Sequence, residues 1–152
     1  LREKQKVKRS YGLLEGKFSD TFSRAARKKG VTGTELLVLL ERRLDNVVYR
    51  LGLGASRRQA RQLVTHGHVL VNGKRVSIPS CTISAGDVVE IAEASKKNPL
   101  VIAAMEAAKS RIIPEWLSLD QAAVRGTVNS VPTREQLPPT IREQLIVELY
   151  SR

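Results

Sequence analysis

The first half of the chain places apolar residues at helical spacing. Residues 1–15 are mostly good helix formers, and residues 18–29 carry apolar side chains on one side and basic ones elsewhere. Apolar residues recur at three- and four-residue steps over residues 34–51, with Thr34 available as a cap and Gly52 following as a stop. The pattern predicts three helices, the last of them continuous over 34–51.

A shorter amphipathic segment and a strand-rich region follow. Ser56 is a good N-cap for a helix over residues 57–66. Asn72 and Gly73 stand between two short runs, and this pair favours a hairpin because both turn residues need positive φ. Strands are expected at residues 68–71, 74–76 and 88–91. Residues 56–91 therefore predict a small α+β module.

The remaining residues mix helix and strand signals. An alanine-rich helix is expected over residues 98–111. Residues 116–131 are typical of two short strands around Gly126, and prolines separate them from a closing helix at residues 140–151. The whole chain is thus expected to be α+β.

Composition and charge narrow the function. Hydrophobic residues make up 41% and charged residues 27% of the 152-residue chain, as in a globular protein of one ordinary domain or two small ones. The formal net charge is +11. Residues 1–30 hold ten Lys/Arg and three Asp/Glu, residues 41–75 hold eight and two, and residues 76–152 hold eight and nine. Such a chain should have one positive side, which needs an anionic partner.

The sequence favours nucleic acid over a membrane as that partner. No apolar run approaches the roughly 18 residues that span a bilayer. The single cysteine, Cys81, cannot form an internal disulfide, is typical of a reducing compartment and is expected to be buried or half-buried. Because the printed sequence begins at Leu1 without a methionine, we expect a fragment or a processed product. No cofactor and no metal are expected.

Three consecutive motifs carry a family resemblance. They are RLDNVVYRLG at residues 43–52, SRRQARQLV at 56–64 and HGHVLVNGK at 66–74. Together they resemble the S4 RNA-binding module, which occurs in several proteins that bind structured RNA. The flanking stretches LREKQKVKRSYGLLE at the start, AARKKG at 25–30 and LPPTIREQLIVELYSR at the end are similar to those of the bacterial small-subunit ribosomal protein S4 family. The resemblance covers essentially the whole chain.

That resemblance implies a domain organisation. The family builds a helical domain from both chain ends, here residues 1–42 and 129–152. A second domain is inserted between them, here residues 43–128, with the RNA-binding module at about 43–107. The family pattern also has a further N-terminal stretch, in some members with a cysteine cluster associated with zinc. The printed sequence begins after that stretch, so we expect a chain shortened at its N-terminus and assign it no zinc.

The same resemblance implies a structural protein of the small ribosomal subunit and not an enzyme. Such a protein would bind small-subunit ribosomal RNA at a multi-helix junction early in assembly, beside other small-subunit proteins. It would be cytoplasmic and ribosome-bound, and a monomer outside the ribosome. Some family members influence decoding accuracy or repress translation of their own messenger RNA. The alternative is a non-ribosomal RNA-binding module of a stress-response or quality-control protein.

The side chains expected to bind RNA are basic and polar groups from the first half of the chain. Structured RNA hides its base edges in a deep, narrow groove, so proteins grip its phosphates and 2′-hydroxyls. Arg57 and Arg61 lie one helical turn apart beside the free backbone amides that follow Ser56, and we expect these groups to converge with the hairpin turn on one groove. The predicted RNA-binding residues are Lys4, Lys6, Lys8, Arg9, Arg24, Arg27, Lys28, Lys29, Arg43, Ser56, Arg57, Arg58, Arg61, Gln62, His66, Asn72, Gly73 and Lys74.

Other interpretations of these residues carry less weight. Pseudouridine synthases have a catalytic aspartate after Arg-Leu, but here Asp45 lies inside a predicted helix. It is expected to pair with an arginine such as Arg42 or Arg43, or to cap a local interaction. His66 and His68 lack the further ligands that a metal would need. The basic helix could also serve a DNA-binding protein, and the basic runs could be a solvated face. Aromatic residues are only 4% of the chain, which favours folded over single-stranded RNA.

Overall fold

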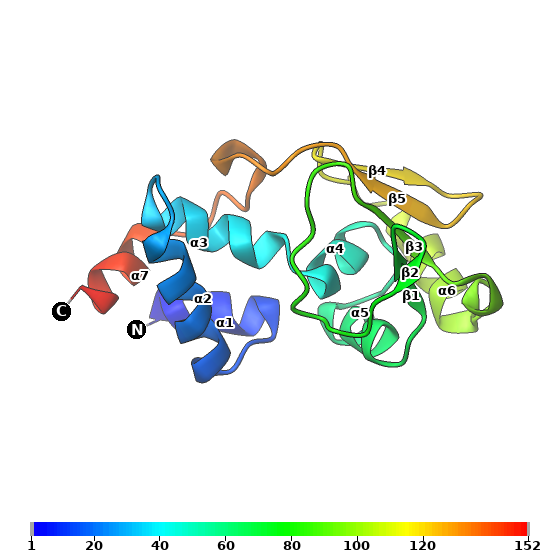
Figure 1. The fold of residues 1–152 in the computed structure, drawn as a ribbon, viewed down its shortest axis with the longest axis horizontal. Helices are drawn as coiled ribbons and strands as arrows, with labels where there is room; N and C mark the ends of the chain where they lie inside the picture. The colour runs from blue at the N-terminus through cyan, green and yellow to red at the C-terminus, as the bar shows by residue number, and fades with distance from the viewer. Residues whose placement is uncertain (1, 152) are drawn as a thin grey trace. The chain divides into compact units, whose positions relative to one another are not determined.

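The chain forms two compact units in the computed structural model, which describes residues 2–151 (Figure 1). The terminal unit comprises the described parts of residues 1–41 and 132–152, and the inserted unit comprises residues 42–131. Residues 2–151 contain seven α-helices and one five-stranded antiparallel sheet, which confirms the predicted α+β class. The units end within three residues of the expected domain boundaries. That the two units fold as separate domains stays a prediction.

The terminal unit is helical. Its elements are α1 (Arg2–Tyr11), α2 (Glu15–Arg27), α3 (Thr32–Glu41), the 3₁₀ turn η2 (Arg134–Gln136) and α7 (Glu143–Tyr150). Leu36, Leu37 and Leu40 of α3 are fully buried in its core. Tyr150 of α7 stacks on Phe22 of α2, with ring centroids 4.3 Å apart. The first and last segments of the chain therefore share one core.

Polar contacts also join the two ends of the chain within this unit. Glu3 accepts a hydrogen bond from the backbone amide of Arg142 at 3.0 Å and forms an ion pair with Lys6 at 3.3 Å. The Lys6 ammonium donates a further hydrogen bond to the carbonyl oxygen of Thr140 at 2.8 Å. The hydrogen bond from Arg142 is the main reason that the pKa of Glu3 lies below its ordinary value.

The continuous helix predicted over residues 34–51 is wrong. Helix α3 ends at Glu41, and a separate helix, α4 (Leu44–Arg50), begins after two intervening residues. Thr34 lies inside α3 and does not cap it. The apolar spacing is the same on both sides of the break, which is why periodicity alone indicated one helix.

A distant loop causes this break. Arg43 is extended and pairs with Thr82 in an isolated antiparallel bridge. The backbone amide of Leu44 then donates to the carbonyl oxygen of Cys81 at 2.9 Å. The first backbone amides of a helix have no acceptor within that helix. The carbonyl group of Cys81 therefore stabilises a new helix start at α4.

The inserted unit combines one sheet with three α-helices that share its core (Figure 1). Its elements are α4, α5 (Arg57–Thr65), β1 (Val69–Val71), β2 (Lys74–Arg75), β3 (Val88–Ile91), the 3₁₀ turn η1 (Glu93–Ser95), α6 (Pro99–Ala108), β4 (Leu117–Asp120) and β5 (Arg125–Val128). The strand order is β2-β1-β3-β5-β4, and all neighbouring strands are antiparallel. Apolar side chains of α4, α5, α6 and the sheet form one core that includes the buried Trp116.

Two glycine predictions had different outcomes. The hairpin turn is confirmed, with φ angles of 52° at Asn72 and 81° at Gly73. Gly126 does not lie in a turn, because it is the second residue of β5 and pairs with Leu119 and Val89. Its small size serves packing instead: Leu51, directly after α4, occupies the space that a side chain would need.

The other predicted elements differ mainly in their ends. The first helix stops at Tyr11, because Gly12 adopts a φ of 70° that a helix cannot continue. The second helix, predicted at 18–29, is α2. The helices predicted at 98–111 and 140–151 are the shorter α6 and α7.

Candidate nucleic-acid interface

Helix α5 and its two caps, Ser56 and His66, carry most of the predicted binding groups of the inserted unit. Ser56 Oγ accepts a hydrogen bond from the backbone amide of Gln59 at 3.1 Å, which confirms the predicted N-cap. The helix buries Ala60, Leu63 and Val64. It exposes Arg58, Arg61, Gln62 and His66. These four side chains define the α5 face, a basic and polar surface open to solvent.

Arg57 is directed differently, toward α4. Its Nε donates to Asn46 Oδ1 at 2.9 Å, and the carbon of its guanidinium group lies 4.7 Å from the centroid of the Tyr49 ring. The side chain is half-buried, whereas Arg61 one turn later is exposed. The two arginines therefore occupy different environments despite their helical spacing.

The hairpin lies beside the end of α5. A Cβ atom at Gly67, just after that helix, would lie 3.3 Å from Arg75 Cδ of strand β2. Gly73 and Lys74 are exposed at the turn, and Arg75 is exposed next to them. Sequence reasoning missed Arg75, whose only signal was its basic side chain directly after Lys74.

Two of the predicted RNA-binding residues make polar contacts within the fold. Arg43 is 8% exposed and holds Asp45 with two bonds, Nε to Oδ1 at 3.1 Å and Nη2 to Oδ2 at 3.0 Å. Asp45 thus pairs with an arginine, as the sequence predicted. Asn72 accepts a hydrogen bond from the Val88 amide and donates one to Asp87 Oδ1, both at 2.9 Å. We therefore leave Arg43 and Asn72 out of the candidate interface.

In the terminal unit, the α1 lysines are engaged in ion pairs. The Lys4 and Lys8 ammonium groups each lie 2.8 Å from a carboxylate oxygen of Glu15, and Lys6 bonds Glu3 and a carbonyl group. Hydrogen bonds from Lys4 and then Lys8 lower the pKa of Glu15 to about 2. Each of these lysines must weaken an internal contact before it can fully neutralise a phosphate.

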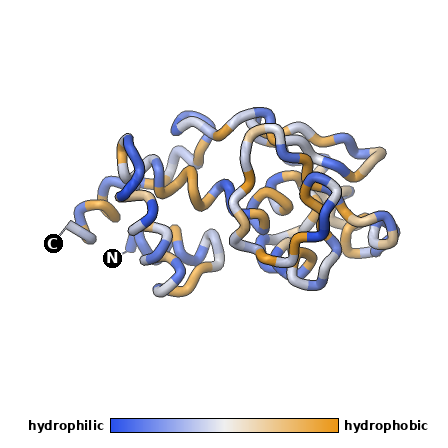
Figure 2. The backbone as a smooth tube through the Cα atoms, in the orientation of Figure 1, coloured by the Kyte–Doolittle hydropathy of each residue, from blue (hydrophilic) through white to orange (hydrophobic). Residues whose placement is uncertain are grey.

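The end of α2 is the more open basic cluster of this unit. Arg24, Arg27, Lys28 and Lys29 are all exposed, and Arg9 is exposed on α1. The turn that follows α2 is coloured mostly hydrophilic in Figure 2. Phosphate groups could reach these five side chains without displacing any apolar packing.

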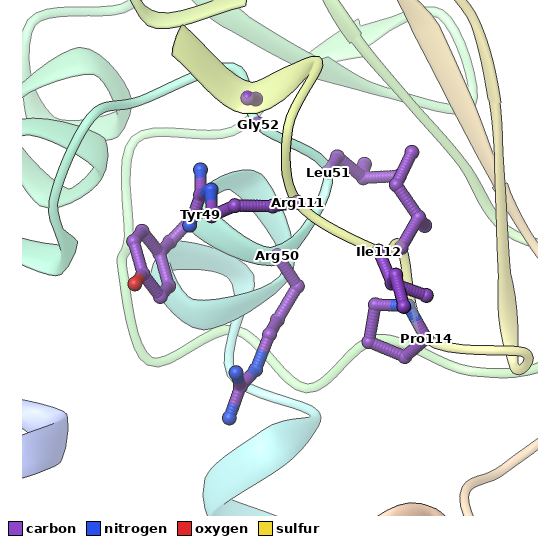
Figure 3. Close-up of a pocket in the computed structure, with 9 residues that line it drawn as sticks. Tyr49, Arg50, Leu51, Gly52, Arg111, Ile112 and Pro114 are labelled. Carbon is purple, nitrogen blue, oxygen red and sulfur yellow. The ribbon is translucent and has the colours of Figure 1, made fainter.

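Sequence reasoning missed a cluster of three arginines around Tyr49. The guanidinium carbons of Arg57, Arg111 and Arg50 lie 4.7, 4.8 and 5.9 Å from its ring centroid. A cavity of about 130 Å³ opens beside the ring, between the ends of α4 and α6 (Figure 3). Arg111 lies far from Tyr49 in the sequence, so no local motif could have joined them.

The chain is similar to known proteins along its whole length. One family model, the S4 domain, matches residues 42–89, and another, the Ribosomal protein S4/S9 N-terminal domain, matches residues 1–41. The small ribosomal subunit protein uS4 of Syntrophus aciditrophicus is 57% identical over 152 residues, which cover 100% of this chain and 73% of that protein. The uS4 proteins of Acidithiobacillus ferrooxidans and Ruminiclostridium cellulolyticum are 55% and 57% identical over the same shares. The chain belongs to the uS4 family.

Membership of the uS4 family confirms the resemblance carried by the motifs and decides the question of catalysis. The uS4 relatives are named as ribosomal proteins, so the chain is a structural protein and not an enzyme. Asp45, the candidate catalytic residue, is 3% exposed and bound to Arg43.

The other residues of this uS4 family member considered for a chemical role are His66, His68 and Cys81. His66 and His68 line a small cavity of about 80 Å³, where His68 Nδ1 lies 2.6 Å from Ser95 Oγ. Residues 2–151 contain no group of three or more His, Cys, Asp or Glu side chains placed to hold a metal. Cys81 is half-buried, as predicted. None of the described helices is both long enough and apolar enough to cross a membrane.

Proposed function

We propose that this chain is a structural constituent of the small ribosomal subunit and binds small-subunit ribosomal RNA. The observation that carries the proposal is the match of the whole chain, at 55–57% identity, to proteins named small ribosomal subunit protein uS4. The alternative, a stress-response or quality-control module, is less favoured because a shared RNA-binding module alone would leave the terminal unit unmatched. Here that unit also matches a ribosomal protein family over residues 1–41.

The proposed interface consists of exposed basic and polar groups, one set in each unit. In the inserted unit it comprises Ser56, Arg58, Arg61, Gln62, His66, Gly73, Lys74 and Arg75, with Arg57 behind them. In the terminal unit it comprises Arg9, Arg24, Arg27, Lys28 and Lys29. Guanidinium groups suit this task because their planar forks can bind two phosphate oxygens at once. A rigid helix and hairpin suit A-form RNA, which is recognised mainly by shape and backbone.

Several finer assignments belong to the same proposal. We assign the chain to a multi-helix junction of the ribosomal RNA, early in subunit assembly, beside neighbouring small-subunit proteins. A role in decoding accuracy, binding to its own messenger RNA, a monomeric state outside the ribosome and a place in the cytoplasm follow from the family resemblance. The near-neutral charge of residues 76–152 suits contacts with protein neighbours better than contacts with RNA.

Filter binding tests the proposal directly. The chain is titrated against the 5′ domain of small-subunit ribosomal RNA, against unrelated RNA of equal length and against duplex DNA, over a salt series. We expect preference for the ribosomal RNA and a steep fall of affinity with salt, with a log–log slope of about −0.7 to −0.9 per phosphate contacted. Equal binding to both RNAs would reduce the chain to a general RNA binder, and preference for DNA would overturn the proposal.

A further inference from the structure

The cluster around Tyr49 has the features of a second type of RNA contact. Tyr49 is the penultimate residue of α4, Arg57 begins α5, and Arg111 follows α6. The guanidinium carbons of Arg57 and Arg111 lie 4.7 and 4.8 Å from the ring centroid, well within cation–π range. Three segments that are separate in the sequence therefore bring two cations onto one aromatic ring.

The cavity beside the ring is suited to an anion. It measures about 130 Å³, which is more than the space that one water molecule needs. Its charged lining residues are Arg50 and Arg111, and no carboxylate is among the residues that line it. Arg111 is exposed and forms no ion pair within residues 2–151. Figure 3 shows its side chain reaching toward Tyr49, while Arg50 extends in another direction.

Close packing fixes the position of Arg111. Gly52, just after α4, has a φ of 84°, and a Cβ atom there would lie 2.6 Å from Ala108 Cβ at the end of α6. The ends of the two helices can approach this closely only because residue 52 is glycine. Arg111 leaves α6 three residues after Ala108, so the contact holds it near the ring.

Stacking on Tyr49 prepares the guanidinium groups for a ligand. The guanidinium carbon of Arg111 lies 4.8 Å from the ring centroid, and a guanidinium group carries five N–H donors that can reach oxygen acceptors. Immobilising a long side chain before binding removes part of the entropy cost that binding would otherwise incur. Arg57 is further fixed by its hydrogen bond to Asn46.

We propose that Tyr49 and Arg111, which line the cavity between the ends of α4 and α6, form a phosphate-binding site for a phosphodiester group of the bound RNA, with Arg57 adding positive charge at the same ring from outside the cavity lining. The inference rests on the proposed RNA-binding function and adds to it a site outside the α5 face. Arg111 lies beyond the residues matched by the S4 domain, which end at 89. The chain therefore recruits a cation from its own later segment to the RNA-binding module.

The test compares Arg111→Gln with Lys109→Gln in the full chain. Lys109 is an exposed cation two residues away, but it pairs with Glu106 at 2.8 Å and does not line the cavity. Affinity for the ribosomal RNA 5′ domain is measured across a salt series, with thermal unfolding to verify folding. We expect roughly tenfold weaker binding for Arg111→Gln, equivalent to one hydrogen bond to a charged group. The magnitude of its salt slope should fall by about 0.7–0.9, and Lys109→Gln should match the wild type.

The possible outcomes separate this inference from the function on which it rests. If the wild-type chain prefers the ribosomal RNA and Arg111→Gln binds like it, the site is refuted while the proposed function stands. Weaker binding with an unchanged salt slope would indicate a nucleobase in the cavity and would overturn the phosphate assignment. If Tyr49→Leu weakens binding and adding Arg111→Gln costs little more, the two residues act as one unit, as we expect. A wild-type chain without RNA preference would overturn both proposals.

Discussion

The side chain of Leu51 lies directly on the backbone of Gly126. A Cβ atom at residue 126 would come within 2.4 Å of Leu51 Cδ1, and both residues are buried. The end of α4, which carries the Tyr49 cluster, therefore rests on strand β5 of the sheet. This contact sets how far α4 can stand from strand β5.

Gly126→Ala should destabilise the inserted unit. The added methyl group must displace Leu51, and such overpacking costs about 1–3 kcal/mol. Chemical denaturation of the two proteins would measure the loss. Gly16→Ala is the matched control, because no atom lies within 4 Å of a Cβ there. We expect that change to be neutral or stabilising by up to about 1 kcal/mol, because glycine is a poor helix residue. Equal stabilities of Gly126→Ala and the wild type would contradict the packing argument.

Local signals in the sequence predicted the local features correctly. The Asn72-Gly73 turn and the Ser56 cap depend on residues close in the chain, and both are confirmed. The break between α3 and α4 could not be predicted, because it depends on carbonyl groups near residue 81 that no local pattern links to Leu44. Periodicity shows which side of a helix is buried, but it does not show where a distant loop supplies hydrogen bonds.

In the candidate interface too, some features follow from local sequence and others depend on residues distant in the chain. Exposure of the α5 face follows from its helical spacing. The engagement of Lys4 and Lys8 by Glu15 needs the turn between α1 and α2. The site at Tyr49 needs Arg111 from the far end of the inserted unit. Charge counting identified the basic segments but could not separate cations that are available to RNA from those engaged in the fold.

Asp45→Asn should lower the stability of the folded protein. Its effect measures an internal ion pair and not a contact with RNA. Arg43 and Asp45 have side-chain exposures of 9% and 4%, and removing one charge leaves the other buried and uncompensated. Breaking such a pair costs about 3–5 kcal/mol. Denaturation midpoints measure the loss. Glu106→Gln, which breaks the exposed pair with Lys109, should cost less than about 1 kcal/mol. Similar losses in the two variants would argue against a structural role for Arg43.

Glu15→Gln should change how stability depends on pH. The folded protein lowers the pKa of Glu15 from 4.5 to about 2, because Lys4 and Lys8 donate to its carboxylate. A lowered carboxyl pKa stabilises the folded state above the unfolded pKa, and that contribution disappears as the pH falls from about 4.5 to about 2. Thermal midpoints of wild type and Glu15→Gln should therefore differ most above about pH 4.5 and converge toward pH 2. Glu148→Gln is the control, since Glu148 forms no ion pair within residues 2–151. A gap between the midpoints that stays constant with pH would contradict the pairing.

The α5 face should account for a measurable share of the salt dependence of RNA binding. Arg58 and Arg61 are exposed on this face, so replacing both with glutamine removes two cations and leaves the buried side of α5 intact. Each lost phosphate contact should reduce the magnitude of the log–log salt slope by about 0.7–0.9. Filter binding to the ribosomal RNA 5′ domain measures this slope. Arg125→Gln is the matched control, because Arg125 is an exposed arginine on β5 that pairs with Glu90 at 3.2 Å. If Arg125→Gln lowers the slope as much per residue as the α5 substitutions do, binding follows total charge and α5 is not a specific interface.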